Sequence, residues 1–541
     1  MTAATFKNIP KTIFLLLGVL FSLNFFPVSG QNNFFKTYDS NSNGNASSLK
    51  CTDNQDIIVG GQTSAVGAYT KSLVMRLHEN GDTVWTKLLS QPSYDLRVFQ
   101  LILNVDRNIL VLSKADERFT ANSLIHIAKL NALTGDTIWT RVTGTAGLSR
   151  VGVHSIANTS DGGIIVSATM ENTGFDSNAA LLRLDSSGNL LWRKSYAFNV
   201  LGSNSINAGP VKQTPDGGFI YATNALAQRG GDILLLKTDS AGDLTWSRLM
   251  GRRYTDRVTD LILTTDSNVL ILGTAFSDTI THYNMFLSKV DFSGNILWAN
   301  SYALLSRYGE YSTRVAETAN GEYIFGGGFQ HGIDTIYPVI IKTDVNGDTL
   351  WTFMSQDPTL RGTFSDVIET TDSGFISGCL QNITPGFKPL AIAKIDSNGT
   401  WNCTPQQYPF TVIPIAFTDT THAMWQSTLL PASFPSFVTQ LSSGFNTATL
   451  CPVIPSNDFL TRYQEKLFVY PTPAGESIHI HLAAFEPGTF LTVYDLDGRA
   501  MVSVPANTQD SKVNISGLSR GIYFLVAVSK KGIARQKFIK Q

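Results

Sequence analysis

The chain has 541 residues, which is too long for one hydrophobic core, so two or three domains are expected. Its 41 basic and 42 acidic residues give a formal net charge of −1, which offers no electrostatic basis for binding nucleic acid. With 43% hydrophobic and 15% charged residues, the composition excludes a disordered chain.

Residues 1–30 have the features of a removable signal peptide. Lys7 and Lys11 precede an apolar run at 13–26, and small residues at 28–30 lie before Gln31. The apolar run is shorter than the ~20 residues that span a bilayer. An N-terminal membrane anchor is the alternative interpretation. We predict an exported protein with no transmembrane segment in the mature chain.

A unit of about 53 residues recurs between residues 31 and 405. Six copies contain a tryptophan four residues after a glycine, and successive tryptophans are 54, 53, 54, 52 and 53 residues apart. A seventh copy at 395–401 keeps the turn but places Trp401 only two residues after Gly399. A fixed period of this length is typical of propellers and solenoids. The repeat tryptophans are Trp85, Trp139, Trp192, Trp246, Trp298 and Trp351.

Each copy contains four strand-like runs separated by turns. In the fourth copy the runs are 211–215, 219–224, 232–239 and 243–250, with glycine-containing turns at 216–218 and 240–242. Glycine supplies the positive φ that short hairpins need. Nearly continuous apolar runs such as 233–236 indicate strands that are buried on both faces. Four-stranded antiparallel sheets of this kind are the blades of a β-propeller.

The N-terminal segment 34–38 predicts how the ring is closed. The seventh copy lacks its proper tryptophan strand, whereas FFKTY at 34–38 has no copy of its own. It aligns with WRKSY at 192–196 and places Phe34 at the tryptophan position. A strand that completes the last blade would remove exposed edges. We predict an all-β protein with a seven-bladed β-propeller at 31–405.

The six tryptophans are interpreted as packing between blades. An aromatic platform for sugars would need exposed rings, whereas a ring that is present in every copy is better explained as interblade packing. LNALTGDTIW (130–139) and LDSSGNLLW (184–192) resemble the tryptophan repeat of quinoprotein-like propellers. The fuller pattern resembles repeat propellers common in surface proteins of Bacteroidetes. The resemblance implies a fold more than an activity. The chain lacks the vicinal Cys-Cys pair of many quinoprotein dehydrogenases, so no cofactor is expected.

One basic residue occupies an equivalent position in every copy. In a closed ring these residues could form an anion site, but interblade ion pairs or partly buried stems are the favoured interpretation. The Asp-x-x-Gly-Asp turns resemble fragments of calcium loops but lack the distal glutamate, so hairpin turns explain them and no metal is expected. The basic residues are Arg76, Lys129, Arg183, Lys237, Lys289, Lys342 and Lys394.

Two further motifs suggest chemistry but lack the required context. Gly517–Gly521 matches the GxSxG nucleophile pattern, yet a strand-like run follows it where that motif needs a helix. His479 and His481 share one face of a predicted strand, without a third ligand for a metal in view. We predict no catalytic residues.

The repeat is absent from residues 406–457, a Pro- and Thr-rich insert and linker that could cap the propeller or act as a spacer. Cys403 and Cys451 bracket the insert and form a candidate disulfide, in keeping with an oxidising compartment. Cys51 and Cys379 lie in the first and seventh copies, which a ring makes neighbours. Whether they pair stays open.

Residues 458–541 contain alternating strands that predict a small immunoglobulin-like β-sandwich. Four motifs in order, YPTPA, DLDGR, LSRGIY and KFIK, resemble the type A C-terminal sorting domain of the type IX secretion system of Bacteroidetes. Thr472 stands where that family usually has Asn. The motif residues are Tyr470, Pro471, Pro473, Ala474, Asp495, Gly498, Arg499, Gly521, Tyr523, Lys537 and Lys540.

This resemblance implies export across the outer membrane by the type IX machinery and removal of the sorting domain near the preceding linker. The mature protein would then be released or attached to surface lipopolysaccharide. We expect a non-enzymatic binding or adhesion module for an unidentified glycan or protein partner. The alternative is a secreted polysaccharide hydrolase or lyase with paired acids at the propeller mouth.

Overall fold

The computed structural model describes residues 33–39, 43–65, 67–120, 122–144, 150–171, 177–197, 206–227, 230–251, 255–276, 282–303, 309–330, 335–355, 362–381, 390–400, 411–414, 418–421, 425–428, 438–441, 446–451, 467–482, 487, 489–495, 500–528 and 533–541. The regular elements in these ranges are all strands. No helix that is long and apolar enough to cross a membrane is found within the described ranges.

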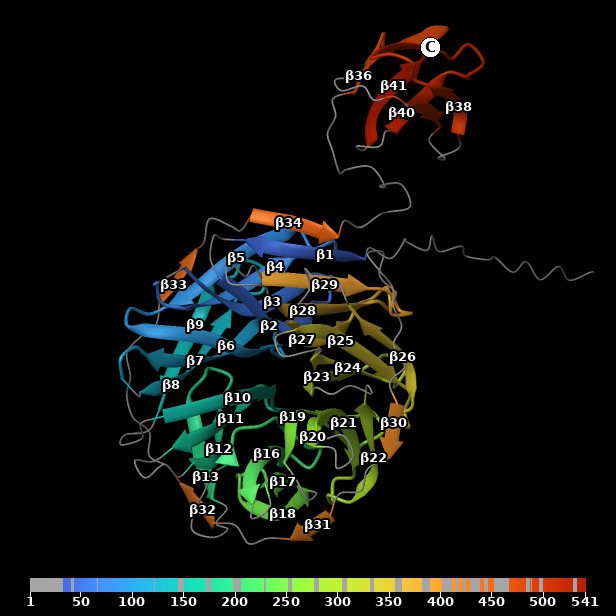
Figure 1. Cartoon of the computed structure of the whole chain (residues 1–541). Helices are drawn as coiled ribbons and strands as arrows, with labels where there is room; N and C mark the ends of the chain where they lie inside the picture. Colours follow the sequence, from blue (N-terminus) through green and yellow to red (C-terminus); the bar gives the residue numbers. More distant parts are fainter. Residues whose placement is uncertain are drawn as a thin grey trace, which may run out of the picture.

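Seven antiparallel sheets are arranged around a central axis (Figure 1). Blade 1 contains β2 (Asn43–Cys51), β3 (Ile57–Ser64), β4 (Lys71–Leu77) and β5 (Thr83–Ser90). Blade 2 contains β6 (Tyr94–Leu103), β7 (Ile109–Glu117), β8 (Ser123–Leu130) and β9 (Thr137–Thr143). Blade 3 contains β10 (Arg150–Asn158), β11 (Ile164–Glu171), β12 (Ser177–Leu184) and β13 (Leu190–Ala197). Blade 4 contains β14 (Ile206–Asn207), β15 (Val211–Gln213), β16 (Phe219–Ala227), β17 (Gly230–Thr238) and β18 (Leu244–Gly251).

Blades 5–7 continue the ring in chain order. Blade 5 contains β19 (Asp256–Leu263), β20 (Val269–Phe276), β21 (Tyr283–Val290) and β22 (Ile296–Ala303). Blade 6 contains β23 (Glu310–Glu317), β24 (Tyr323–Gln330), β25 (Ile336–Thr343) and β26 (Thr349–Met354). Blade 7 contains β27 (Gly362–Glu369), β28 (Phe375–Gln381), β29 (Leu390–Ile395) and β1 (Phe34–Asp39). The all-β propeller fold predicted from the repeat is confirmed.

The N-terminal strand closes the ring, as the alignment of FFKTY predicts. β1 pairs with β29 in an antiparallel ladder from Phe34↔Lys394 to Tyr38↔Leu390. The Tyr38 hydroxyl donates to the carbonyl of Gly81 in blade 1 at 2.6 Å. Tyr196 makes the same bond to Gly242 at 2.7 Å, so the closing strand reproduces the contacts of an ordinary fourth strand.

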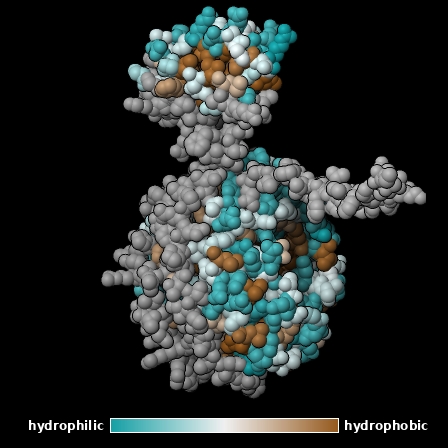
Figure 2. Space-filling model, turned by 90° about the vertical axis from the view of Figure 1, so that its right-hand side faces the viewer, coloured by the Kyte–Doolittle hydropathy of each residue, from teal (hydrophilic) through white to brown (hydrophobic). Residues whose placement is uncertain are grey.

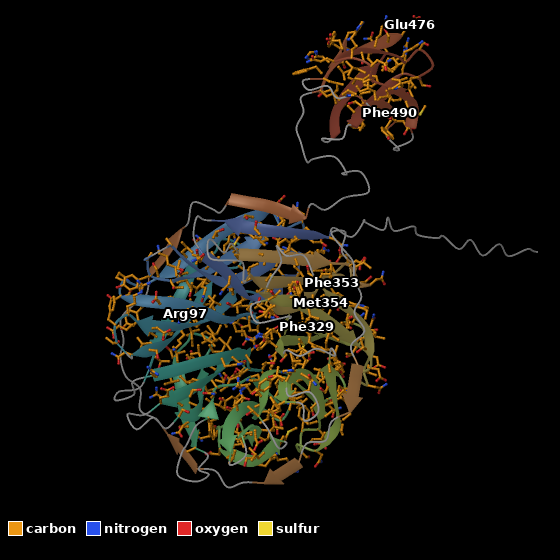
Figure 3. All side chains as sticks on the ribbon, in the orientation of Figure 1. Arg97, Phe329, Phe353, Met354, Glu476 and Phe490 are labelled. Carbon is orange, nitrogen blue, oxygen red and sulfur yellow. The ribbon has the colours of Figure 1, made fainter. Side chains whose placement is uncertain are left out.

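The hydrophobic core lies between neighbouring blades, and side chains of one strand point alternately to the two blades that flank it. On β26, Phe353 belongs to the apolar cluster shared with blade 7, and the next residue, Met354, to the cluster shared with blade 5 (Figure 3). This arrangement explains why the middle strands are apolar at almost every position.

Each repeat tryptophan packs on a turn glycine of the following blade. These glycines have positive φ values, and an added Cβ would lie 2.5–2.9 Å from the aromatic ring. The close approach therefore excludes any side chain at these turns. The pairs are Trp85–Gly135, Trp139–Gly188, Trp192–Gly242, Trp246–Gly294, Trp298–Gly347 and Trp351–Gly399, and Phe34 packs on Gly81 in the same way.

The insert contributes outer strands to five blades. We call these strands the belt: β30 (Thr411–Pro414), β31 (Thr418–Thr421), β32 (Trp425–Thr428), β33 (Val438–Leu441) and β34 (Asn446–Cys451). They pair in turn with β22, β18, β13, β5 and β1, so the belt runs around the rim against the order of the blades (Figure 1). The sequence indicated a cap or spacer here, whereas these strands cover the outer edges of sheets.

The C-terminal segment forms two facing sheets around its own core. One sheet contains β35 (Leu467–Tyr470), β36 (Ser477–Leu482) and β39 (Asp510–Asn514). The other contains β38 (Ala500–Pro505), β37 (Phe490–Tyr494), β40 (Gly521–Val528) and β41 (Ile533–Lys540).

The cysteines of the first and seventh blades are not bridged: Cys51 and Cys379 are both free thiols. Cys51 ends β2, whereas Cys379 pairs with Phe364 and Ala391 inside blade 7. Cys403, one half of the candidate bridge to Cys451, lies outside the described ranges. The predicted signal peptide at residues 1–30 also lies outside them.

Candidate functional site

The periodic basic residues on the third strands do not form a free anion site. Each pairs with an acid in the hairpin between the first and second strands of its own blade, for example Lys129 Nζ with Asp106 Oδ2 at 2.6 Å. Among the described residues, the expected interblade ion pair is found for Lys394, which contacts both Asp372 (2.8 Å) and Glu79 of blade 1 (3.0 Å). The other pairs are Arg76–Asp56, Arg183–Asp161, Lys237–Asp216, Lys289–Asp266 and Lys342–Glu322.

The first strand of each blade lies closest to the axis (Figure 1). These strands can be aligned on the polar residue that begins the following turn, such as Thr52, Asn104 or Thr214. Two residues before it, five blades have an aliphatic side chain: Ile102, Ala157, Ile262, Ala316 and Ile368. Blades 1 and 4 instead have Lys50 and Lys212. The two lysines therefore lie on opposite sides of the ring.

Two residues earlier on the same strands, blades 5, 6 and 7 have Asp260, Arg314 and Asp366. Arg314 Nη1 lies 3.3 Å from Asp260 Oδ1, and Lys50 Nζ lies 3.9 Å from Asp366 Oδ2. We call Lys50, Lys212, Asp260, Arg314 and Asp366 the axial cluster. It contains three cations and two carboxylates.

Arg314 crosses the centre of the ring. Its Nη2 donates to the carbonyl of Phe99 at 3.4 Å, which joins blade 6 to blade 2 on the opposite side. Arg314 also acts electrostatically on His154 of blade 3, whose pKa is lowered to about 3 by burial first and by the Arg314 charge second. The guanidinium therefore connects blades 2, 5 and 6 at this level of the axis.

Both axial carboxylates are held by the protein. Asp366 Oδ2 accepts from the backbone N–H of Leu49 at 2.9 Å and from the Ser48 hydroxyl at 3.1 Å. Asp260 Oδ2 accepts from the backbone N–H of Val315 at 3.1 Å. Each carboxylate thus links its blade to the next one in the ring.

Lys212 is the one member of the axial cluster without an ion pair in the part of the chain that the structure describes. Burial lowers its pKa, and the charges of Lys50 and Arg314 act in the same direction. Asp260 and Asp366 oppose that effect. Lys212 lies on β15, at the inner edge of blade 4, and charges from blades 1, 5, 6 and 7 all act on it there.

A second acidic pair lies away from the axis, between blades 4 and 5. The pKa of Asp232, on the third strand β17, is raised to about 6 by burial first and then by the charge of Asp256 on β19. A carboxyl group with a pKa raised toward neutral pH is partly protonated there and can act as a general acid. Within the described ranges, no three His, Cys, Asp or Glu side chains converge in the manner of a metal site.

The surface view does not reveal a broad apolar face. On the side shown in Figure 2, the described part of the propeller is mostly hydrophilic and carries separate apolar patches. Single exposed apolar residues of this kind are ordinary on folded proteins.

Motifs from both ends of the C-terminal sandwich meet. Ala474 is fully buried, donates its N–H to the carbonyl of Ile539 at 2.6 Å, and accepts from the N–H of Gln541 at 2.9 Å. Thr472 Oγ1 accepts a hydrogen bond from the N–H of Ile539 at 3.2 Å. The threonine that replaces the usual asparagine of the motif therefore contacts the last strand. Pro471 and Pro473 follow cis peptide bonds.

The remaining motif residues lie at several places. Tyr523 stacks on Phe538, with ring centroids 5.8 Å apart, while Lys537 is exposed and Lys540 is partly exposed. Gly521 begins β40, so the GxSxG match is followed by a strand. Asp495 follows β37, whereas Gly498 and Arg499 lie outside the described ranges.

The two histidines of β36 are engaged on the same sheet. His479 stacks on Tyr470 with ring centroids 5.8 Å apart, and His481 Nδ1 lies 2.8 Å from Asp510 Oδ1. Both side chains therefore have a partner on a neighbouring strand of this sheet.

The axial cluster was not predicted from the sequence, because its residues form no local motif. The available signal was Lys50 and Lys212 at strand positions where the other copies have Ile or Ala. An alignment of the seven copies on the turn after the first strand would have found them.

Comparison with known proteins identifies the C-terminal segment. Residues 468–541 match the family model described as the secretion system C-terminal sorting domain. No curated protein matches the chain.

Solved structures that match this chain include a protein of unknown function from Dyadobacter fermentans, with 9% identity and a TM-score of 0.42, covering 57% of this chain and 96% of that chain. The polysaccharide lyase Uly1 has 12% identity and a TM-score of 0.42, covering 65% and 90%. PorZ, a surface component of the type-IX secretion system of Porphyromonas gingivalis, has 8% identity and a TM-score of 0.22, covering 94% and 100%. The C-terminal domain is a type IX secretion system sorting domain, and the chain is an all-β protein exported by that route, to the outer surface or the medium.

Proposed function

We propose that the propeller is a non-enzymatic binding module that holds a glycan or protein partner outside the cell. The observation that carries this proposal is the state of the axial cluster. Its cations outnumber its carboxylates, and both carboxylates already accept hydrogen bonds from backbone N–H groups. A general base needs a group positioned to take a proton from the substrate. The axial cluster offers binding charge instead.

A paired binding and turnover assay tests this function. The chain from residue 31 onward would be applied to arrays of neutral and acidic surface glycans, and the same polymers would be assayed for new reducing or unsaturated ends. We expect saturable binding without new ends. New ends from any polymer that the protein binds would instead make the propeller an enzyme.

The alternative function is a polysaccharide hydrolase or lyase, and Asp232 is the observation in its favour. Its raised pKa suits a general acid, and Asp256 provides a second carboxyl group. If new ends do form, Asp232→Asn should abolish them while Asp344→Asn, in an exposed hairpin turn, should not. Turnover that survives Asp232→Asn would exclude this pair as the catalytic acids.

We also propose that the sorting motifs act together as the recognised element. The contacts of Thr472 and Ala474 with the chain end support this view, because they join the YPTPA and KFIK motifs. Removal of residues 538–541 should leave the protein inside the outer membrane, measured by cell fractionation. After export, a ladder of masses on gels would indicate attachment to lipopolysaccharide, and a single mass in the medium would indicate release.

A further inference from the structure

We infer that the axial cluster is an oxyanion site, in which Lys212 and Lys50 hold a carboxylate, sulfate or phosphate group of the ligand. This inference rests on the proposed binding function and specifies the chemistry of the partner. The group could belong to an acidic polysaccharide or be a free small anion, and the test below separates these two sources.

The position of Lys212 carries the argument. Burying a charge is costly unless it is paired, and five of the seven blades avoid that cost with Ile or Ala at this position. Lys212 lies on β15, which pairs with β16 at the inner edge of blade 4, and it has no ion-pair partner among the described residues. A bound anion would supply the missing partner.

Lys50 is suited to share that anion. Its Nζ lies 3.9 Å from Asp366, at the limit of an ion pair, and its side chain is 33% exposed. Asp366 is only 6% exposed and has closer partners in Leu49 and Ser48. Lys50 can therefore turn toward a ligand without leaving that carboxylate unsatisfied.

Arg314 defines how far the ligand can enter. It is held by Asp260 and by the carbonyl of Phe99 across the axis. On the aligned first strands, Lys50 and Lys212 lie two residues before the turn to the second strand, and Arg314 lies four residues before it. This difference of two residues corresponds to about 6.5 Å along a strand. An anionic group that enters from that side would meet the two ammonium groups first and the guanidinium behind them.

The repeat itself provides a conservative test variant. Lys212→Ile introduces the side chain that blades 2, 5 and 7 have at this position, and it leaves two cations and two carboxylates on the axis. Lys114→Gln removes the same charge from β7, where Lys114 pairs with Asp116 at 2.8 Å, and serves as the matched control.

The first arm uses sulfate, phosphate and acetate as probes, with chloride at equal ionic strength as the reference. Calorimetric titration and thermal unfolding of the chain from residue 31 onward should show a saturable oxyanion effect. Affinity should fall about tenfold to a hundredfold in Lys212→Ile and stay unchanged in Lys114→Gln. Equal affinity in all three proteins, or no oxyanion effect in any of them, would overturn the inference.

The second arm uses uronate and sulfated oligosaccharides together with neutral ones. A polymer source predicts that acidic oligosaccharides bind more tightly than the free anions and lose affinity in Lys212→Ile. Equal binding of free anions and acidic oligosaccharides would identify a small-anion site. Binding of neutral glycans that is insensitive to Lys212→Ile would sink the oxyanion inference and leave the binding function intact.

Discussion

The basic residues of the third strands and the lysines near the axis differ in whether each charge has an acidic partner. The third-strand set recurs in all seven blades, and every member has an acidic partner in its own blade. The axial lysines occur in two blades, and Lys212 lacks such a partner among the described residues. A charge that recurs with the repeat serves the architecture, whereas a charge that breaks the repeat points to a task specific to this protein.

The largest expected effect comes from the recurring set. Lys394 is fully buried between Asp372 and Glu79, so Lys394→Met would leave two carboxylates without their shared cation. We expect a loss of about 3–5 kcal/mol in the free energy of unfolding, measured by denaturant titration. A loss below about 1 kcal/mol would mean that a basic residue can recur in every blade without stabilising the fold.

The recurring tryptophans should behave in the same way. Trp192 packs on Gly242 and contacts Phe219 edge to face, with ring centroids 5.8 Å apart. Because the ring is partly exposed, Trp192→Ala should cost about 3 kcal/mol, at the lower end of the range for buried aromatic residues. Glycan binding by the folded fraction should be unchanged, and a selective loss of binding would reassign the ring as a contact residue.

His126 also departs from the repeat, and its replacement tests whether every such departure is functional. It is fully buried on β8, where the other blades have apolar residues such as Leu73 and Leu234. Burial lowers its pKa to about 3. The unfolded state, with a pKa near 6.5, therefore binds the proton first, and stability falls as pH decreases from 6.5 toward 3.

His126→Leu should remove up to about 2 kcal/mol of the stability lost between pH 7 and pH 5, measured from denaturant midpoints at both pH values. The exposed His479→Leu serves as the control and should leave the pH dependence of propeller unfolding unchanged. Altered ligand binding in His126→Leu would extend the functional region into blade 2.

The smallest effect on stability is expected at the axis. Lys212→Ile replaces an uncompensated charge by an aliphatic side chain, so the free energy of unfolding should rise by less than about 1 kcal/mol. A large destabilisation would show that the ammonium has a structural partner and would place Lys212 with the recurring set.

Most of the propeller could be predicted because its determinants are local and repeated. The glycine turns, the apolar strands and the alignment of FFKTY with WRKSY each depend on a short stretch of sequence. The pairing of Lys129 with Asp106 was harder, because it depends on which strand lies beside which hairpin. The belt and the Arg314–Phe99 contact could not be predicted, since they join residues that the repeat pattern does not relate.

The position of β34 has a mechanical consequence. This last belt strand pairs with β1, which in turn pairs with β29, so the two ends of the propeller chain lie side by side in one sheet. Tension applied through the C-terminal domain therefore reaches the β34–β1 ladder before any other hydrogen bonds of the propeller. Separation of β34 would expose the outer edge of β1, while the β1–β29 ladder would still close the ring.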